Sequence, residues 1–217
     1  MQIFSPRANV ITRSILIGGA ILPFLAIGVT YGYMNSSYVT GQGVILRQPV
    51  PFSHKHHVRE LGIGCLNCHT GVETSAFAGL PATHICMGCH SQIWTNAALL
   101  APVRESLADG KPIRWNRVHR LPAYVYFDHS VHIAKGVGCS SCHGRIDEMA
   151  LTAQAKPLTM GWCLSCHRNP APNLRPLSEI YTMTWQPPPD QDRKGAELVK
   201  VNHINTARLI ECSICHR

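Results

Sequence analysis

The longest hydrophobic segment of the chain lies near its N-terminus. No charged side chain occurs between Ser14 and Leu46, and residues 15–34 are mostly apolar. A stretch of about twenty apolar residues is long enough to cross a bilayer as a helix. The pattern predicts one transmembrane helix over residues 14–35, preceded by a short cytoplasmic segment over residues 1–13. Arg7 and Arg13 precede the span without an acidic residue, which favours this orientation and places the rest of the chain on the periplasmic, outer face of the cytoplasmic membrane.

A cleaved secretory signal is the alternative interpretation, because such signals also place a basic region before an apolar one. The apolar stretch is longer than an ordinary signal core, and no clear Ala-x-Ala cleavage site follows it. We therefore expect a retained, single-pass anchor in contact with membrane lipid. Pro23 is expected to kink this helix, and the Gly28-x-x-x-Gly32 spacing would let a neighbouring helix approach closely.

Beyond the anchor the hydrophobic pattern predicts little regular structure. Apolar residues recur near helical spacing between Ser91 and Gly110, which predicts a short amphipathic helix capped by Ser91, ended by Gly110 and shortened or kinked by Pro102. Prolines at 170, 172, 176 and 187–189 predict an extended connection before the C-terminal residues. We divide this part of the chain into a linker over residues 36–51 and an outer domain over residues 52–217.

The cysteines supply the strongest chemical signal. All ten fall in five copies of Cys-x-x-Cys-His. In this motif the two thiols form thioethers with a c-type haem, and the histidine is the proximal ligand of the iron. The sequence predicts five haem c groups, in a domain of short α-helices and loops wrapped around haems with little or no β-sheet. The attachment residues are Cys65, Cys68, Cys86, Cys89, Cys139, Cys142, Cys163, Cys166, Cys212 and Cys215, and the proximal ligands are His69, His90, His143, His167 and His216.

Zinc is the alternative cofactor, because Cys-x-x-Cys pairs also bind that metal. Seventeen residues separate Cys68 from Cys86 and twenty separate Cys142 from Cys163, and both gaps match zinc-ribbon spacing. The histidine after every second cysteine favours haem, and zinc would leave the fifth pair of cysteines without partners.

The formal net charge of +8 raises the question of a nucleic-acid partner. Each haem carries two propionates, so five haems would offset this positive charge. No basic run or aromatic-interleaved patch is present, and the outer location is unsuited to nucleic acid. We expect no nucleic-acid partner.

Residues 52–90 and 127–167 are two copies of one sequence unit. Both begin Phe-x-His-x-x-His and continue through seven or six residues, ending in Gly, to a haem motif. Histidines three residues apart are neighbours on a helix, and an iron with a proximal ligand offers one further axial position, so each histidine pair is expected to serve two haems. The predicted distal ligands are His54, His57, His129 and His132. The fifth haem is expected over residues 203–217.

The remaining histidines offer a fifth distal ligand. His119, just before the second copy, is the predicted choice. Met160, His84 and His203 are less favoured as distal ligands: Met160 precedes the fourth motif, where packing is the commoner role for methionine, and the two histidines, like His56, are expected to contact solvent or propionates.

Four segments resemble the pentahaem cytochrome c subunit of alternative complex III. The Phe-x-His-x-x-His units also resemble class III cytochromes of the c3 and c7 type. His84 departs from the family pattern. The resemblance covers most of the chain and is carried by Pro51-Phe-Ser-His-Lys-His-His, Gly79-Leu-Pro with Cys86-Met-Gly-Cys-His, Val118-His-Arg-Leu-Pro-Ala-Tyr-Val-Tyr-Phe-Asp-His129 and Pro157-Leu-Thr-Met-Gly-Trp-Cys163.

The resemblance implies an electron-transfer subunit rather than an enzyme. Its partners would be an iron–sulfur protein and polytopic membrane subunits that oxidise menaquinol. The chain would pass electrons to a periplasmic acceptor, such as a soluble cytochrome c or a blue-copper protein, in a respiratory or photosynthetic chain.

Three other functions fit a multihaem protein. A catalytic multihaem reductase needs an open axial position, whereas eight histidines outside the motifs are available for five irons. A stand-alone, membrane-anchored quinol dehydrogenase would act without partner subunits. A reaction-centre cytochrome would rely on methionine ligands, and the chain has only six methionines.

Overall fold

The computed structural model describes residues 5–216, which form two compact units, residues up to 42 and residues from 43. The division between them falls inside the predicted linker. Residues 1–4 of the predicted cytoplasmic segment and Arg217 lie outside the described residues.

The first unit contains one long helix, α1 (Pro6–Met34). Residues 7–34 contain an 18-residue window with a mean hydropathy of 2.0, none of which is buried, so the helix is long and apolar enough to cross a membrane. It begins before the predicted span, since hydropathy marks the apolar part of a helix and not its first turns. Pro23 lies inside α1 without ending it. A short helix, α2 (Ser37–Thr40), follows and ends at Gly41, whose φ is 70°.

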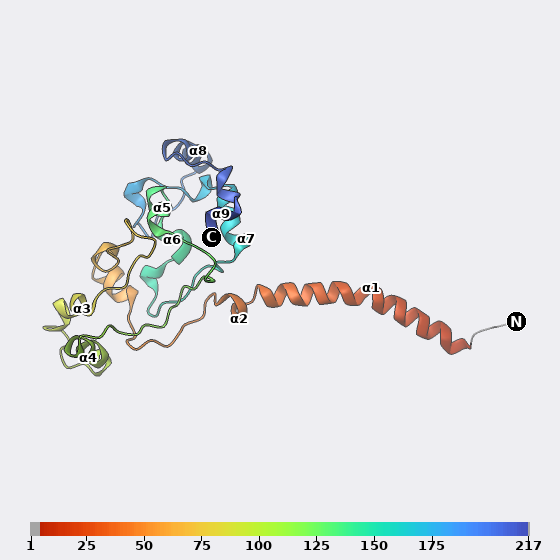
Figure 1. Ribbon diagram of the computed structural model, residues 1–217, viewed down its shortest axis with the longest axis horizontal. Helices are drawn as coiled ribbons and strands as arrows, with labels where there is room; N and C mark the ends of the chain where they lie inside the picture. Colours follow the sequence, from red (N-terminus) through yellow and green to blue (C-terminus); the bar gives the residue numbers. More distant parts are fainter. Residues whose placement is uncertain (1–4, 217) are drawn as a thin grey trace. The chain divides into compact units, whose positions relative to one another are not determined.

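The second unit consists of short helices joined by loops (Figure 1). The described residues of this unit form isolated bridges and no strands, among them Ile45 with Ala153, Val125 with His216 and Val137 with Leu174, so no sheet forms there. The predicted fold class of short helices and loops is confirmed. The α-helices are α3 (Thr83–His90), α4 (Ala101–Asp109), α5 (His129–Ala134), α6 (Cys139–His143), α7 (Met160–Arg168), α8 (Gln191–Val201) and α9 (Cys212–Cys215). A π-helix, η1 (Lys55–Glu60), and the 3₁₀ turns η2 (Cys65–Asn67), η3 (Ala98–Leu100), η4 (Ile146–Glu148), η5 (Ala171–Asn173), η6 (Leu177–Glu179) and η7 (Arg208–Ile210) complete it.

The helix predicted between residues 91 and 110 is shorter than expected. α4 begins at Ala101, with a proline in its first turn, and Ser91 is the C-cap of α3 and not the N-cap of this helix. Proline is well suited to a first turn but lacks the N–H that a helix interior needs, which explains the late start. Gly110 ends the helix as predicted, with φ 64°.

The predicted extended connection before the fifth motif is wrong over residues 191–201, where α8 forms. Once the prolines end at 189, good helix formers follow, with Asp192 in the first turn and Lys200 in the last. α8 packs on η5, and a Cβ at Gly195 would lie 2.1 Å from the carbonyl oxygen of Ala171. Packing against a proline-fixed turn was not visible in the local sequence pattern.

We expect Gly195→Ala to destabilise the protein by about 1–3 kcal/mol, because the methyl group would push α8 away from backbone atoms that cannot rotate aside. Thermal unfolding of the purified protein measures the loss. Glu197→Ala on the exposed face of the same helix is the control and should leave the unfolding temperature nearly unchanged. Equal unfolding temperatures for both variants would contradict this packing.

The two sequence copies fold alike despite their different lengths. The first copy has one more residue between its second histidine and the following motif, and here the helix is π rather than α. The amide of Ile63 bonds to the His57 carbonyl, whereas in the second copy the amide of Val137 bonds to the His132 carbonyl, one residue sooner. A π-helix turn absorbs one inserted residue without disturbing its surroundings.

The apolar core of protein side chains is small. Within residues 5–216, one cluster joins Val50, Leu100 and Val103. The other buried apolar side chains are Val72, Leu174, Ile180 and Met183. Seven buried apolar residues are few for a domain of this length. The space between the short helices is therefore suited to large apolar groups other than side chains.

Candidate haem sites

Four predicted proximal histidines each lie opposite one predicted distal histidine. The ring centroids of His54 and His69 are 6.5 Å apart with planes 7° from parallel. Those of His129 and His143, in the second copy, are 6.4 Å apart at 8°. The remaining two pairs share a 6.2 Å separation, His57 with His90 at 67° and His132 with His167 at 29°.

This repeated spacing fits a metal atom between each pair of rings. A metal–imidazole bond is about 2 Å long, so two imidazoles on opposite sides of one metal place their ring centres about 6 Å apart. Each histidine of the i, i+3 pair lies opposite a different motif. One short helix thus contributes to two sites in each copy.

A phenylalanine holds each pair of distal rings. Phe52 meets His54 edge to face at 4.9 Å and is nearly parallel to His57 at 4.4 Å. Phe127 repeats this with His129 at 4.7 Å and His132 at 4.5 Å. Such contacts fix the orientation of the histidine rings. This explains why a phenylalanine occurs at the same position in both copies of the sequence repeat.

Hydrogen bonds occupy Nδ1 of most predicted ligands and leave Nε2 for a metal. Backbone carbonyls accept from His57, His132, His69, His90, His129, His167 and His216, and Thr152 Oγ1 lies 3.0 Å from His54 Nδ1. A carbonyl partner on one ring nitrogen is what fixes the tautomer and orientation of a metal-binding histidine.

The electrostatics of the sites favour uncharged rings. Burial, with nearby histidines, lowers the pKa of His54 to about 4 and that of His143 to about 3. Burial also lowers the pKa of His132. These rings are neutral near pH 7, and the neutral imidazole is the form that binds a metal.

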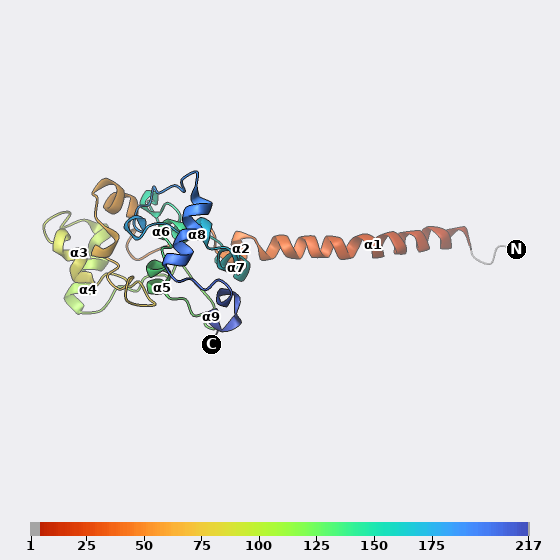
Figure 2. The same ribbon diagram turned by 90° about the horizontal axis from the view of Figure 1, so that it is seen from above.

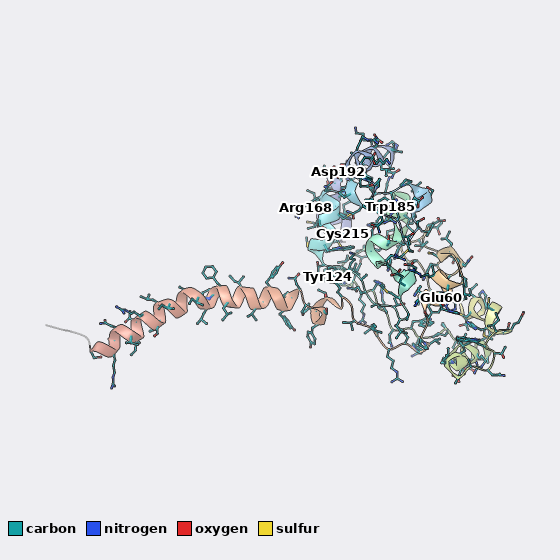
Figure 3. All side chains as sticks on the ribbon, turned by 180° about the vertical axis from the view of Figure 1, so that it is seen from behind. Glu60, Tyr124, Arg168, Trp185, Asp192 and Cys215 are labelled. Atoms are coloured by element: carbon teal, nitrogen blue, oxygen red, sulfur yellow. The ribbon has the colours of Figure 1, made fainter. Side chains whose placement is uncertain are left out.

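The fifth motif has different surroundings. His216 donates from Nδ1 to the carbonyl of Tyr124 at 3.2 Å, and the amide of Tyr126 bonds to the carbonyl of Cys215 at 2.8 Å. Figure 3 labels Tyr124 and Cys215 and shows their segments side by side. The structure does not bring the predicted distal ligand, His119, to this motif: its Nε2 lies 3.2 Å from Nδ1 of His143, at the third motif.

The less favoured candidates lie at the surface. Met160, at the first position of α7, is 63% exposed. His84 and His203 are also exposed, and His203 has a positive φ of 50°. His56, next to the half-buried His57, forms an ion pair with Glu60 and does not lie opposite a proximal histidine among the described residues.

The cysteines are unpaired in the described chain. Burial raises the pKa of Cys139 to about 11 and that of Cys142 to about 12. No group of three or more His, Cys, Asp or Glu side chains gathers as a metal site within residues 5–216.

Sequence reasoning missed two residues that support the sites. Thr152 reaches His54 across 98 positions. Arg175, 3% exposed, donates to Ser140 and Ser141 inside the third motif. No local pattern marks either residue, because each acts on a segment far away in the sequence.

Comparisons with known proteins add one finding. No family model matches the chain. The chain is 39% identical over 97 residues to the protein named "Menaquinone reductase, multiheme cytochrome c subunit" of Nitratidesulfovibrio vulgaris. The match covers 44% of this chain and 45% of the relative, less than half of either. The likeness supports a multihaem cytochrome c, whereas alternative complex III specifically stays a prediction.

Proposed function

We propose that the chain is an electron-transfer subunit of a quinone-linked membrane complex and binds five haem c groups covalently. The observation that carries the proposal is the spacing of 6.2–6.5 Å that recurs between proximal and distal histidines at four motifs. The small side-chain core and the likeness to a multihaem cytochrome subunit support it. The fifth haem rests on the fifth Cys-x-x-Cys-His motif.

The residues of the chain would hold and orient each group. The cysteines anchor it on one side, the paired histidines fill both axial positions, and backbone carbonyls fix the imidazole rings. Bound haem supplies one-electron exchange at iron. Saturated axial positions leave no place for a substrate, so electron transfer fits the first four sites better than catalysis at iron.

The partners and location form the second part of the proposal. α1 anchors the chain in the cytoplasmic membrane with its N-terminus inside, and residues from 43 lie on the periplasmic face. The partners are iron–sulfur and polytopic membrane subunits, as in alternative complex III, with a soluble cytochrome c or blue-copper protein as acceptor. Menaquinol, oxidised by the partner subunits, is the electron source.

The name of the relative, a menaquinone reductase subunit, favours a second direction, in which electrons pass toward menaquinone. Stopped-flow mixing of the native complex with a menaquinol analogue, and separately with a reduced periplasmic cytochrome, distinguishes the two. Rapid haem reduction in the first experiment supports quinol oxidation, and reduction only in the second supports quinone reduction. Haems that stay oxidised in both, while the overall reaction proceeds, would contradict the electron-transfer role.

Haem content is tested independently of direction. We expect the intact mass of the purified chain to exceed that of the polypeptide by five haems, and a pyridine haemochrome assay to give the same ratio. Cys212→Ser with Cys215→Ser should lower the count by one. A mass equal to the bare polypeptide, or zinc found by elemental analysis, would contradict the proposed cofactor.

A further inference from the structure

The ligand-bearing segments touch one another in a consistent sequence. Numbering the sites by the order of their motifs, we infer that they lie in a single file in the order second, first, third, fourth, fifth. The inference rests on the proposed function, because it takes each motif as a haem site. This order joins the two copies through the first and third sites and leaves the second and fifth sites at the ends.

Within each copy, two sites share one helix. η1 carries the distal residue of the second site, His57, next to that of the first site, His54, and Phe52 contacts both rings. In the second copy, α5 carries the corresponding residues of the third and fourth sites, with Phe127 between. The first site therefore adjoins the second, and the third adjoins the fourth.

The first and third sites meet where the copies join. His129 of the third site donates from Nδ1 to the carbonyl of Ala76, in the loop after the first motif, at 2.9 Å. The amide of Ser130 bonds to Ser75 in the same loop. In the other direction, Thr152, which follows the third motif, reaches His54 of the first site. Each site thus supplies part of the support of the other.

A third contact closes the same junction. The Tyr181 hydroxyl donates to Glu73, just after the first motif, at 2.7 Å, and the backbone next to it is bonded to the third motif, where the Cys139 amide donates to the Ile180 carbonyl. The backbone of the third motif is therefore bonded to a segment that contacts the chain just after the first motif.

The fifth site adjoins the fourth. His167, the proximal ligand of the fourth site, donates from Nδ1 to the carbonyl of Leu209 at 2.9 Å. Leu209 belongs to η7, which packs on α7 and directly precedes the fifth motif in α9. The segment that positions one site thus leads into the next.

The arrangement of helices agrees with this order. Figures 1 and 2 both show α3, with the second motif, and α9, with the fifth, on opposite sides of the second unit, with α6 of the third motif between them. Electrons that enter at one end and leave at the other have to pass the third site. The two ends are the positions at which partner proteins would exchange electrons with the chain.

A cryo-electron microscopy map of the native complex tests the order directly through iron–iron separations. We expect the shortest four separations to join second and first, first and third, third and fourth, and fourth and fifth sites, with the second and fifth irons farthest apart. Haems at all motifs in another order would overturn the file and leave the proposed function standing. Motifs without haem would overturn the proposed function itself.

Removal of single haems gives a second, kinetic test. Cys139→Ser with Cys142→Ser removes the central site, so two haems of the remaining four should be reduced rapidly whichever end electrons enter. Cys65→Ser with Cys68→Ser is the matched variant and removes the first site. One haem should then be reduced rapidly if electrons enter at the second site, and three if they enter at the fifth. All four haems reduced rapidly in the first variant would overturn the order, and the map decides independently if a variant does not fold.

Discussion

Replacing His57 by alanine is expected to convert one haem from six-coordinate and low-spin to high-spin, whereas replacing its neighbour His56 changes none. The two histidines are adjacent in sequence and on the same π-helix. The His57 ring centroid lies 6.2 Å from that of the proximal His90, and its Nδ1 is bonded to the Ser53 carbonyl. His56 instead forms an exposed ion pair with Glu60. An iron that loses an axial ligand and gains only water becomes high-spin.

Electron paramagnetic resonance of the oxidised, purified protein measures the change. His57→Ala should show a high-spin ferric signal for one haem and a matching loss of low-spin intensity, and it should raise the rate of carbon monoxide binding to the reduced protein. His56→Ala provides the control, since it removes a histidine from the same turn. High-spin signal in His56→Ala but not in His57→Ala would show that the assignment on this helix is wrong.

The approach of the Phe-x-His-x-x-His histidines to haem motifs could be anticipated from the sequence because part of its geometry is local. Phe-x-His-x-x-His places Phe52 just before the helix that His54 and His57 begin, and a repeat with the same spacing reproduces the ring contacts at the second copy. Which motif lies opposite each histidine was not predictable, because that depends on how the chain folds back between residues 57 and 90. The π-helix was hidden as well, although one extra residue in the first copy was its signal.

Contacts between distant segments account for what the sequence did not reveal. α8 packs against Ala171 through Gly195, a contact between segments that are distant in sequence. The prolines before α8 favoured an extended segment, and the local sequence did not show this packing. His119 was predicted as the fifth distal ligand without a particular motif, and the fold places it beside His143 of the third motif. The number of available histidines limits how many ligands there can be, but it does not show where the fold places each imidazole ring.

The largest loss of stability is expected from Arg175→Ala. The Arg175 guanidinium donates to Ser140 and Ser141 of the third motif and to the carbonyl of Thr182, and it lies 4.3 Å from the centre of the Trp185 ring. Hydrogen bonds that involve a buried charge contribute more than neutral ones, and alanine would also leave a cavity. We expect a loss of roughly 3 kcal/mol or more of unfolding free energy.

Denaturant unfolding of the holoprotein measures this loss, and haem content shows where it acts. Because Arg175 holds the segment between Cys139 and Cys142, the variant should retain less haem at the third site than at the others. Arg175→Lys should recover only part of the stability, since an ammonium lacks the planar fork that reaches both serines. Arg193→Ala, on the exposed face of α8, is the control. Full stability and full haem content in Arg175→Ala would show that this buried cation is dispensable.

Gly138 tests the same contact from the opposite side. A Cβ at Gly138 would lie 2.2 Å from Arg175 Cζ, so Gly138→Ala should displace the guanidinium without removing it. If the Arg175 contacts determine the geometry of the third motif, Gly138→Ala and Arg175→Ala should lower haem retention at that site to a similar extent. The double variant should then lose less haem than the sum of the two single losses. Additive losses would mean that Gly138 and Arg175 act independently. The third site lies at the junction of the two copies, so coupled losses there should also slow electron transfer between the remaining sites.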